Sequence, residues 1–94
     1  MLFVIHCLDK PDHQAVRAAN REAHLAYLAP LADRVVAAGP TLTDDGTAMT
    51  GSLLIIDFDD RAAAERFVAD DPYAKAGLFE RVDVSRWRRV LPKD

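Results

Sequence analysis

The side chains best suited to chemistry lie close together in a predicted helix. Arg21 stands three residues before His24, and Leu28 stands four residues after it, so the three side chains share one helix face. An imidazole can move protons at neutral pH, and a guanidinium can hold a carboxylate or a developing oxyanion. The pair therefore indicates an acid–base site, although an ordinary histidine on a solvated helix face has the same spacing.

A carboxylate could orient this histidine. Asp33 follows His24 by nine positions, which on an uninterrupted helix at ~100° per residue places it on the opposite side. Pro30 interrupts the helix, and a restarted helix can swing Asp33 back toward the imidazole, where it would fix the tautomer. His24 and Asp33 are thus the candidate catalytic residues, and a surface ion pair of Asp33 with Arg34 or Arg17 is the alternative.

Two further side chains are candidates for substrate binding together with Arg21. Ser52 follows Gly51 at the start of a hydrophobic strand, where a small hydroxyl can bond to a ligand because the backbone comes close. Tyr73 can line the same pocket with its amphipathic ring. Structural packing is the alternative for both residues.

The segment that contains Tyr73, DPYAKAG at residues 71–77, has the composition of a short helical turn. Asp71 can cap this turn, Pro72 fits its first position and Gly77 suits a left-handed exit. This pattern of residues predicts a turn that forms part of the wall of a pocket.

Other classes of site lack their signatures. No two histidines are closely spaced and Cys7 is the only cysteine, so we expect no metal. The four glycines are isolated and form no phosphate-binding or dinucleotide-binding loop, so we expect no cofactor. The apolar neighbours of Cys7, Ile5 and Leu8, predict a buried thiol without a nucleophilic role.

Composition limits the partners and the compartment. Twelve basic and fifteen acidic side chains give a net charge of −3, so no overall positive field recruits nucleic acid. RNA contact through the arginines of residues 86–89 is a weaker option that predicts salt-dependent binding. The apolar residues 1–8 are too short to span a bilayer and lack the flanks of a signal peptide, so we expect no membrane role. A lone cysteine fits a reducing compartment, and we predict a cytoplasmic protein.

The elements that must position these residues begin with a strand and a helix. Residues 2–8 are dense in β-forming residues, and a helical segment follows from about His13 to Ala38. Pro30 should divide this segment into two unequal pieces, and Gly39 with Pro40 should end it.

A hairpin, a second helix and a last strand complete the predicted order βαββαβ. The hairpin consists of a short strand at residues 41–43, a turn and a hydrophobic strand at residues 51–58. A helix capped by Asp59 or Asp60 runs to about Ala69, and the last strand spans about residues 78–90. Residues 1–94 thus predict a single α+β domain of ferredoxin-like form, an antiparallel four-stranded sheet with two helices on one face.

Two of the predicted strands are apolar on both faces. In the first strand one face carries Leu2, Val4, His6 and Leu8, and the other carries Phe3, Ile5 and Cys7. The second hydrophobic strand likewise has apolar residues on both faces. The helices can cover only one face, and exposed aliphatic side chains would cost several kcal/mol at ~25 cal/mol per Å². We therefore predict a homodimer through the open sheet face, with coverage by the chain's own loops as the alternative.

Several segments together resemble the YciI-like (YCII-related) family. They are REAHLAYL at 21–28, AAGP at 37–40, TGS at 50–52 and DPYAKAGLFERV at 71–82, and MLFVIHCLDKPD at 1–12 is similar to that family's first strand and loop. The resemblance covers nearly the whole chain. It implies a dimeric α+β barrel with a cleft in each subunit around a histidine of the first helix, which corresponds to His24. It also implies a His–Asp dyad, which we carry onto Asp33.

These observations favour a small cofactor-independent enzyme, a lyase or isomerase. His24 would shuttle a proton, Asp33 would orient it, and Arg21 and Ser52 would hold a small polar or ring-containing metabolite, so that elimination or isomerisation suits the site. The competing class is a non-catalytic module that binds a small ligand or another protein. The fold cannot choose between them, because the wider superfamily resembles a mixed set of enzymes and binding proteins.

Overall fold

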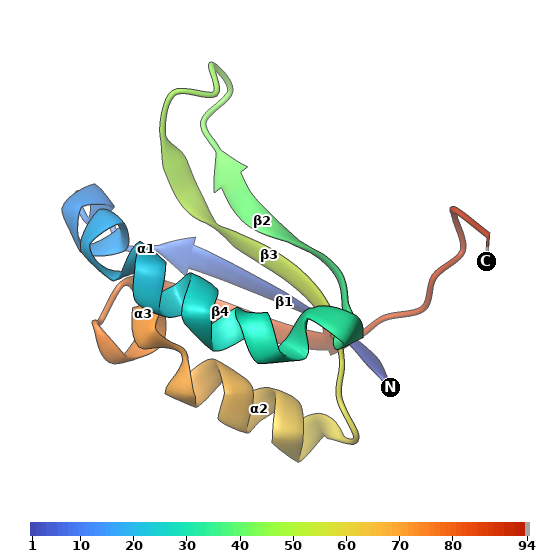
Figure 1. The fold of residues 1–94 in the computed structure, drawn as a ribbon. Helices are drawn as coiled ribbons and strands as arrows, with labels where there is room; N and C mark the ends of the chain where they lie inside the picture. Colours follow the sequence, from blue (N-terminus) through green and yellow to red (C-terminus); the bar gives the residue numbers. More distant parts are fainter. Residues whose placement is uncertain (94) are drawn as a thin grey trace.

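The structure, a computed structural model, describes residues 1–93 as a four-stranded sheet with its helices on one side (Figure 1). The strands lie in the order β2-β3-β1-β4, and every neighbouring pair is antiparallel. This arrangement confirms the predicted ferredoxin-like βαββαβ fold. In chain order the elements are β1 (Leu2–Asp9), α1 (Gln14–Leu28), the 3₁₀ helix η1 (Ala29–Arg34), β2 (Val35–Leu42), β3 (Met49–Asp57), α2 (Arg61–Asp70), α3 (Pro72–Lys75) and β4 (Phe79–Arg86).

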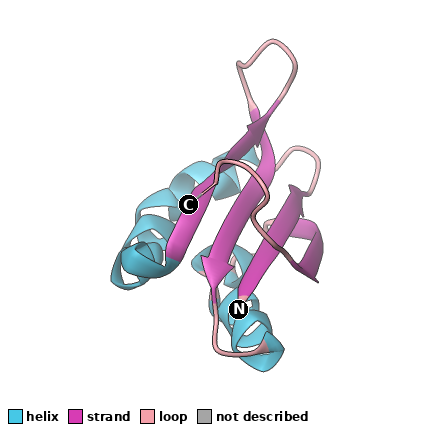
Figure 2. Ribbon diagram, turned by 90° about the vertical axis from the view of Figure 1, so that its right-hand side faces the viewer, coloured by secondary structure: helices cyan, strands magenta, loops and turns pink. Residues whose placement is uncertain are grey.

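The core lies between the sheet and the helices, which Figure 2 shows together on one side of the strands. Phe3, Ile5 and Cys7 of β1 are buried, as their alternation with the more exposed residues of the strand requires. Helix α2 closes the core with Ala64 and Phe67, which lie one turn apart on its buried face. None of the helices within residues 1–93 is long and apolar enough to cross a membrane.

Pro30 divides the first helical segment as predicted, but the chain after it differs from the prediction. It forms η1 and then enters β2 at Val35, so the expectation of a helix as far as Ala38 is wrong. Val35 and Val36 are β-branched and favour a strand. Pro40, which we expected to help end the helix, lies inside β2, where it is tolerated because β2 is an edge strand. The predicted short strand is the end of this longer one.

The last strand is shorter than predicted. It ends at Arg86, and the segment that follows leads away from the sheet toward the C-terminus (Figure 1). Val90 and Leu91 in this segment are 73% and 74% exposed, so no contact within residues 1–93 buries them.

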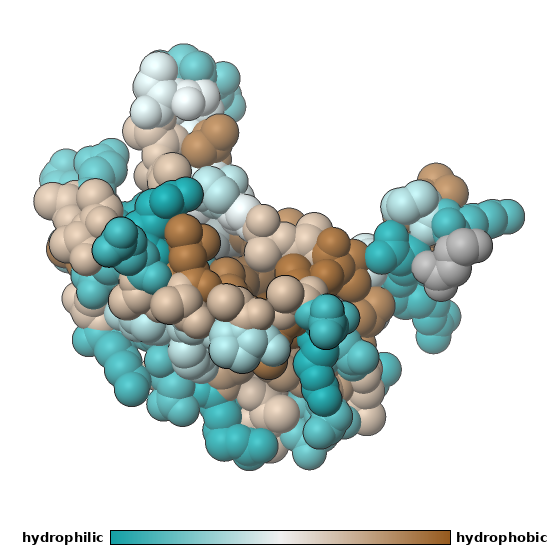
Figure 3. Space-filling model, viewed as in Figure 1, coloured by the Kyte–Doolittle hydropathy of each residue, from teal (hydrophilic) through white to brown (hydrophobic). Residues whose placement is uncertain are grey.

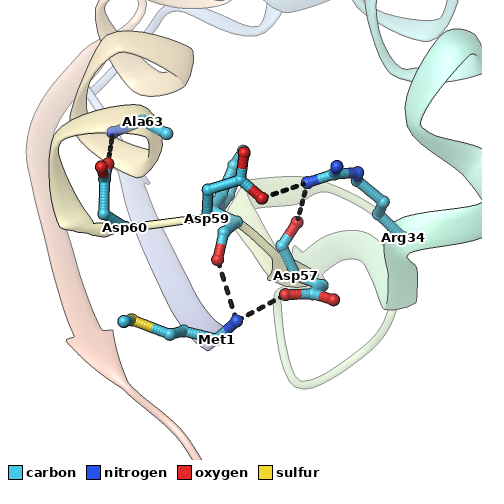
Figure 4. Close-up of polar contacts among 7 residues, drawn as sticks. Met1, Arg34, Asp57, Asp59, Asp60 and Ala63 are labelled. Carbon is cyan, nitrogen blue, oxygen red and sulfur yellow. Dashed lines mark hydrogen bonds and ion pairs between the residues drawn. The ribbon is translucent and has the colours of Figure 1, made fainter.

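Acidic side chains fix the start of α2 (Figure 4). Asp60 is the cap, and its carboxylate accepts a hydrogen bond of 2.8 Å from the backbone N–H of Ala63. The neighbouring Asp59, the alternative cap, instead lies 3.5 Å from the guanidinium of Arg34 at the end of η1. Figure 4 also shows the α-amino group of Met1 donating to the Asp57 carboxylate at 2.6 Å and to the Phe58 carbonyl at 2.9 Å. These contacts tie the N-terminus and η1 to the connection between β3 and α2.

The opposite face of the sheet carries apolar side chains that no helix covers. Leu8 of β1 and Leu53 of β3 are 40% and 39% exposed, and each is adjacent in sequence to a buried residue. Alternation therefore places both leucines on the face away from α1 and α2. We call this surface the open face.

We predict that Cys7 resists alkylation in the folded protein. Burial, aided by the negative charge of Asp71, raises the pKa of the Cys7 thiol to about 12, so the reactive thiolate is about a thousandfold scarcer than for a free cysteine near neutral pH. Iodoacetamide labelling followed by mass spectrometry should be slow in buffer and fast in denaturing guanidinium chloride. Cys7→Ala, which must not label in either solvent, is the control, and rapid labelling of the native protein would contradict the prediction.

Candidate functional site

A cavity of about 210 Å³ lies between α1 and the part of the sheet formed by β2 and β3. Ala38 and Pro40 of β2 pair with the buried residues Leu54 and Ser52, yet both are exposed because no helix packs onto this end of the sheet. This uncovered part of β2 and β3 forms one wall of the cavity, and α1 forms the other. The lining residues are Arg17, Arg21, His24, Leu25, Leu28, Ala38, Gly39, Pro40, Met49, Ser52, Leu54 and Tyr73.

His24 is held in this cavity by a buried carboxylate. Its Nδ1 lies 3.0 Å from Oδ1 of Asp71, and the exposed fractions of the two side chains are 9% and 4%. A carboxylate only accepts hydrogen bonds, so Nδ1 carries the proton and donates it, and in the neutral imidazole Nε2 then carries the lone pair. This is the tautomer that a general base requires.

The same carboxylate starts α3. Oδ1 of Asp71 accepts a hydrogen bond of 2.9 Å from the backbone N–H of Tyr73, with Pro72 at the first helical position. Gly77 then leaves the turn with a φ of +74°, as the segment predicted. The turn therefore positions Asp71, the hydrogen-bond partner of His24, and places the side chain of Tyr73 on the cavity wall.

Tyr73 supports two charged or chargeable groups. Its ring stacks on His24 with centroids 4.2 Å apart and an angle of 19°, and the guanidinium carbon of Arg17 lies 4.6 Å from the ring centroid. Burial raises the pKa of Tyr73, although the positive charge of Arg17 opposes the shift. The phenol consequently stays protonated at neutral pH.

Arg17 is a buried cation that pairs with a buried carboxylate. Its Nε and Nη2 donate to the two oxygens of Asp9 at 2.7 and 2.8 Å, and Nη2 also donates to Oγ of Ser52 at 2.9 Å. Burial disfavours the charge, but the hydrogen bonds and attraction of Asp9 outweigh it and raise the pKa of Arg17. Because Ser52 accepts from Arg17, its own O–H remains a donor for another group.

Gly51 lets Ser52 take this place. A side chain at position 51 would collide with the carbonyl oxygen of Cys7, so only glycine permits the approach of β3 to β1 here. Arg21 completes the polar lining. It is exposed, and no carboxylate of residues 1–93 forms an ion pair with it, so Arg21 is the cation of the cavity whose charge no carboxylate cancels.

The structure brings together four of the five predicted site residues. Arg21, His24, Ser52 and Tyr73 all line the cavity. Asp33 does not: it is exposed in η1, because the chain continues after Pro30 as a 3₁₀ helix and does not return this side chain to the imidazole. The expected pairing of His24 with Asp33 is therefore replaced by His24 with Asp71, a residue that we had predicted only as a helix cap.

Sequence reasoning missed Arg17 and Asp9. Arg17 precedes Arg21 by four residues and His24 by seven, so helical spacing already placed it on the same face. Asp9 ends β1 and gave no comparable signal. Within residues 1–93, histidine, cysteine and acidic side chains form no group of three or more that could hold a metal ion.

Comparisons with known proteins agree with this fold. The chain is 42% identical to the 5-chloro-2-hydroxyhydroquinone dehydrochlorinase of Burkholderia phenoliruptrix AC1100, whose structure was solved with 2,5-dihydroxybenzoquinone; the match covers 100% of both chains with a TM-score of 0.90. PA3566 from Pseudomonas aeruginosa shares the fold at 16% identity, with a TM-score of 0.54 over 95% of this chain and 92% of that one.

Sequence comparisons identify the family of the chain. Protein YciI of Escherichia coli O6:H1 is 40% identical over 98 residues, which cover 97% of this chain and 100% of that protein. Residues 1–88 match the YCII-related domain. The chain is thus a member of the YCII-related domain family, as its motifs indicated.

Proposed function

We propose that the protein is a cofactor-independent lyase or isomerase in which His24 is the general base. The observation that carries the proposal is the buried His24–Asp71 pair on the wall of a cavity. The substrate would be a small, polar, ring-containing metabolite that carries an acidic C–H or O–H next to its leaving group or migrating bond.

The proton transfer follows from the tautomer. Nε2 of His24 takes a proton from the substrate, and the resulting imidazolium is stabilised by the Asp71 carboxylate at Nδ1. In an elimination the leaving group then departs with its bonding electrons. In an isomerisation the same imidazolium returns the proton to a different atom of the substrate.

The other lining residues would hold the substrate. Arg21 offers a positive charge that no carboxylate of residues 1–93 cancels, so it suits an ionised oxygen. Ser52 can donate its O–H because Oγ already accepts from Arg17. The apolar side chains of Leu25, Leu28 and Leu54 offer contact for the ring.

The similar enzyme supports elimination as the first choice. A dehydrochlorinase removes hydrogen and chlorine from its substrate, and the protein that is 42% identical was solved with an oxygen-rich quinone ring. A ring of this kind has ionised oxygens for Arg21 and Ser52. 5-Chloro-2-hydroxyhydroquinone is therefore the first substrate to test, and 2,5-dihydroxybenzoquinone is the first ligand.

We predict that His24→Asn and Asp71→Asn each lower kcat for chloride release by about 100- to 10,000-fold, the usual range for a lost general base or its partner. The affinity for 2,5-dihydroxybenzoquinone should change much less, because Arg21 and Ser52 remain. Chloride release and isothermal titration calorimetry measure the two effects. Circular dichroism should first establish that the variants are folded.

Asp33→Asn is the matched control, since it makes the same carboxylate-to-amide change at an exposed aspartate and should leave kcat unaltered. Loss of activity in Asp33→Asn with an active Asp71→Asn would reject the proposed pair. If the wild-type protein binds the quinone tightly but turns over no substrate, the ligand-binding module becomes the better description.

We also propose that two copies associate through the open face. Leu8 and Leu53 would otherwise leave apolar surface in water, and a second copy can cover it with the same residues. Analytical ultracentrifugation should give twice the mass of one chain at micromolar concentration.

Leu53→Lys should shift this equilibrium to monomers, because it places a charge in the proposed contact. Leu25→Lys is the matched control: Leu25 is 46% exposed, similar to Leu53, but it lies on α1 at the other side of the sheet. A wild-type monomer, or equal dissociation by both substitutions, would refute this interface.

A further inference from the structure

A second hollow of about 270 Å³ adjoins the cavity that contains His24. The two share the lining residues Arg17, Arg21 and Met49. The second hollow adds residues from the first turns of α1 and from the hairpin between β2 and β3, namely Gln14, Ala18, Thr47 and Ala48. The two spaces are therefore neighbouring parts of one groove.

One stripe of α1 forms a continuous wall of this groove. Gln14, Ala18, Arg21, Leu25 and Leu28 follow one another at intervals of three or four residues and so lie on one helix face. The first two line the second hollow, the last two line the cavity, and Arg21 belongs to both. Arg21 thus marks the junction between the two parts.

The hairpin forms the facing wall and is braced from within. In Figure 3 the hairpin projects from the body of the molecule, and the second hollow is lined by this hairpin and by α1. Oδ1 of Asp45 accepts from the Thr43 hydroxyl at 2.6 Å and from the backbone N–H and hydroxyl of Thr47 at 3.0 and 2.8 Å. The Thr43 hydrogen bond, followed by those of Thr47, lowers the pKa of Asp45 to about 2, so the brace persists through the neutral range.

The chemistry of the second hollow differs from that of the cavity. Next to the shared Met49, the inner surface carries the methyl groups of Ala18 and Ala48, and the polar groups added to the shared Arg17 and Arg21 are those of Gln14 and Thr47. Two alanines leave space that larger side chains would fill. A cavity of about 210 Å³ is smaller than the ~300–1,000 Å³ of typical ligand sites, and the adjoining hollow of about 270 Å³ extends the space open to a ligand.

We propose that the second hollow is a subsite for an apolar arm of the ligand. The ring would lie beside His24, an ionised oxygen or carboxylate would lie at Arg21, and an arm of a few carbons would extend over Ala18, Ala48 and Met49. The position of the ring rests on the proposed function, but the arm subsite and the anion contact do not. The preferred ligand is thus an amphiphilic acid that is longer than a single ring.

The test uses 2,5-dihydroxybenzoquinone and its 3-propyl and 3-hexyl derivatives, with calorimetry as the readout. Each buried methylene contributes up to ~0.8 kcal/mol, about fourfold in affinity, so the propyl derivative should bind at least about tenfold more tightly than the parent ring. Ala18→Leu fills the hollow, and this gain should disappear while the affinity for the parent ring stays within about twofold.

Ala19→Leu is the matched control. It makes the same change at the next position of α1, at an exposed residue that lines neither part of the groove, so the gain should survive. Where the parent quinone binds, no gain from the arm in the wild-type protein, or an equal gain in Ala18→Leu and Ala19→Leu, would overturn the proposal.

A ring-free probe separates this proposal from the function proposed above. Octanoate should place its carboxylate at Arg21 and its chain in the hollow, which would shift the Met49 methyl resonance in NMR spectra of wild-type and Ala19→Leu but not of Ala18→Leu. If the quinones fail to bind and octanoate shows this pattern, the ring assignment fails and the arm subsite stands. If octanoate leaves the Met49 resonance unchanged, the arm subsite is wrong even where the parent quinone binds.

Discussion

The site depends on one oxygen atom. Oδ1 of Asp71 accepts both from Nδ1 of His24 and from the backbone N–H of Tyr73, so the same atom orients the imidazole and begins α3. A buried carboxylate without such partners would carry a large desolvation cost. The turn at residues 71–77 and the acid–base pair therefore cannot be separated: a change that loosens the turn also frees the imidazole, and the stacking of Tyr73 on His24 adds to this coupling.

The buried ion pair of Arg17 with Asp9 adds almost no net charge to the cavity. The charges of Arg17 and Asp9 cancel each other, and Nη2 of Arg17 also donates a hydrogen bond that fixes Ser52. Their charges thus contribute orientation more than attraction, because a ligand that approaches the pair meets almost no net charge. Arg21, in contrast, is exposed, lines both hollows and carries a positive charge that no carboxylate of residues 1–93 pairs with. The buried Arg17 therefore positions Ser52, whereas the exposed Arg21, one helical turn away, can attract an anion.

The sequence predicted the elements better than it predicted the contacts between them. Alternation in β1 predicted that Phe3, Ile5 and Cys7 share one face of the sheet, and helical spacing placed Arg21 and His24 on one face of a helix, because both signals are local. The boundary after Pro30 was predicted wrongly, since the alanines that suggest a helix as far as residue 38 also fit an exposed edge strand. Asp71 lies 47 residues from His24, and only the packing of α3 against α1 joins them. No spacing rule within one element could have revealed that pair.

Strand β3 links the site to the open face. Ser52 and Leu54 line the cavity while Leu53, between them, is exposed on the other side of the sheet. Consecutive side chains of one strand therefore belong to two different surfaces. Packing of a second copy against Leu53 would hold β3, and through it the Ser52 hydroxyl, in a fixed position relative to α1. Because Ser52 is already fixed by Arg17, which rests on Asp9 of β1, the geometry of the cavity does not require that packing. Contacts within one chain therefore already position Arg17, Ser52, Tyr73 and Asp71 around the cavity.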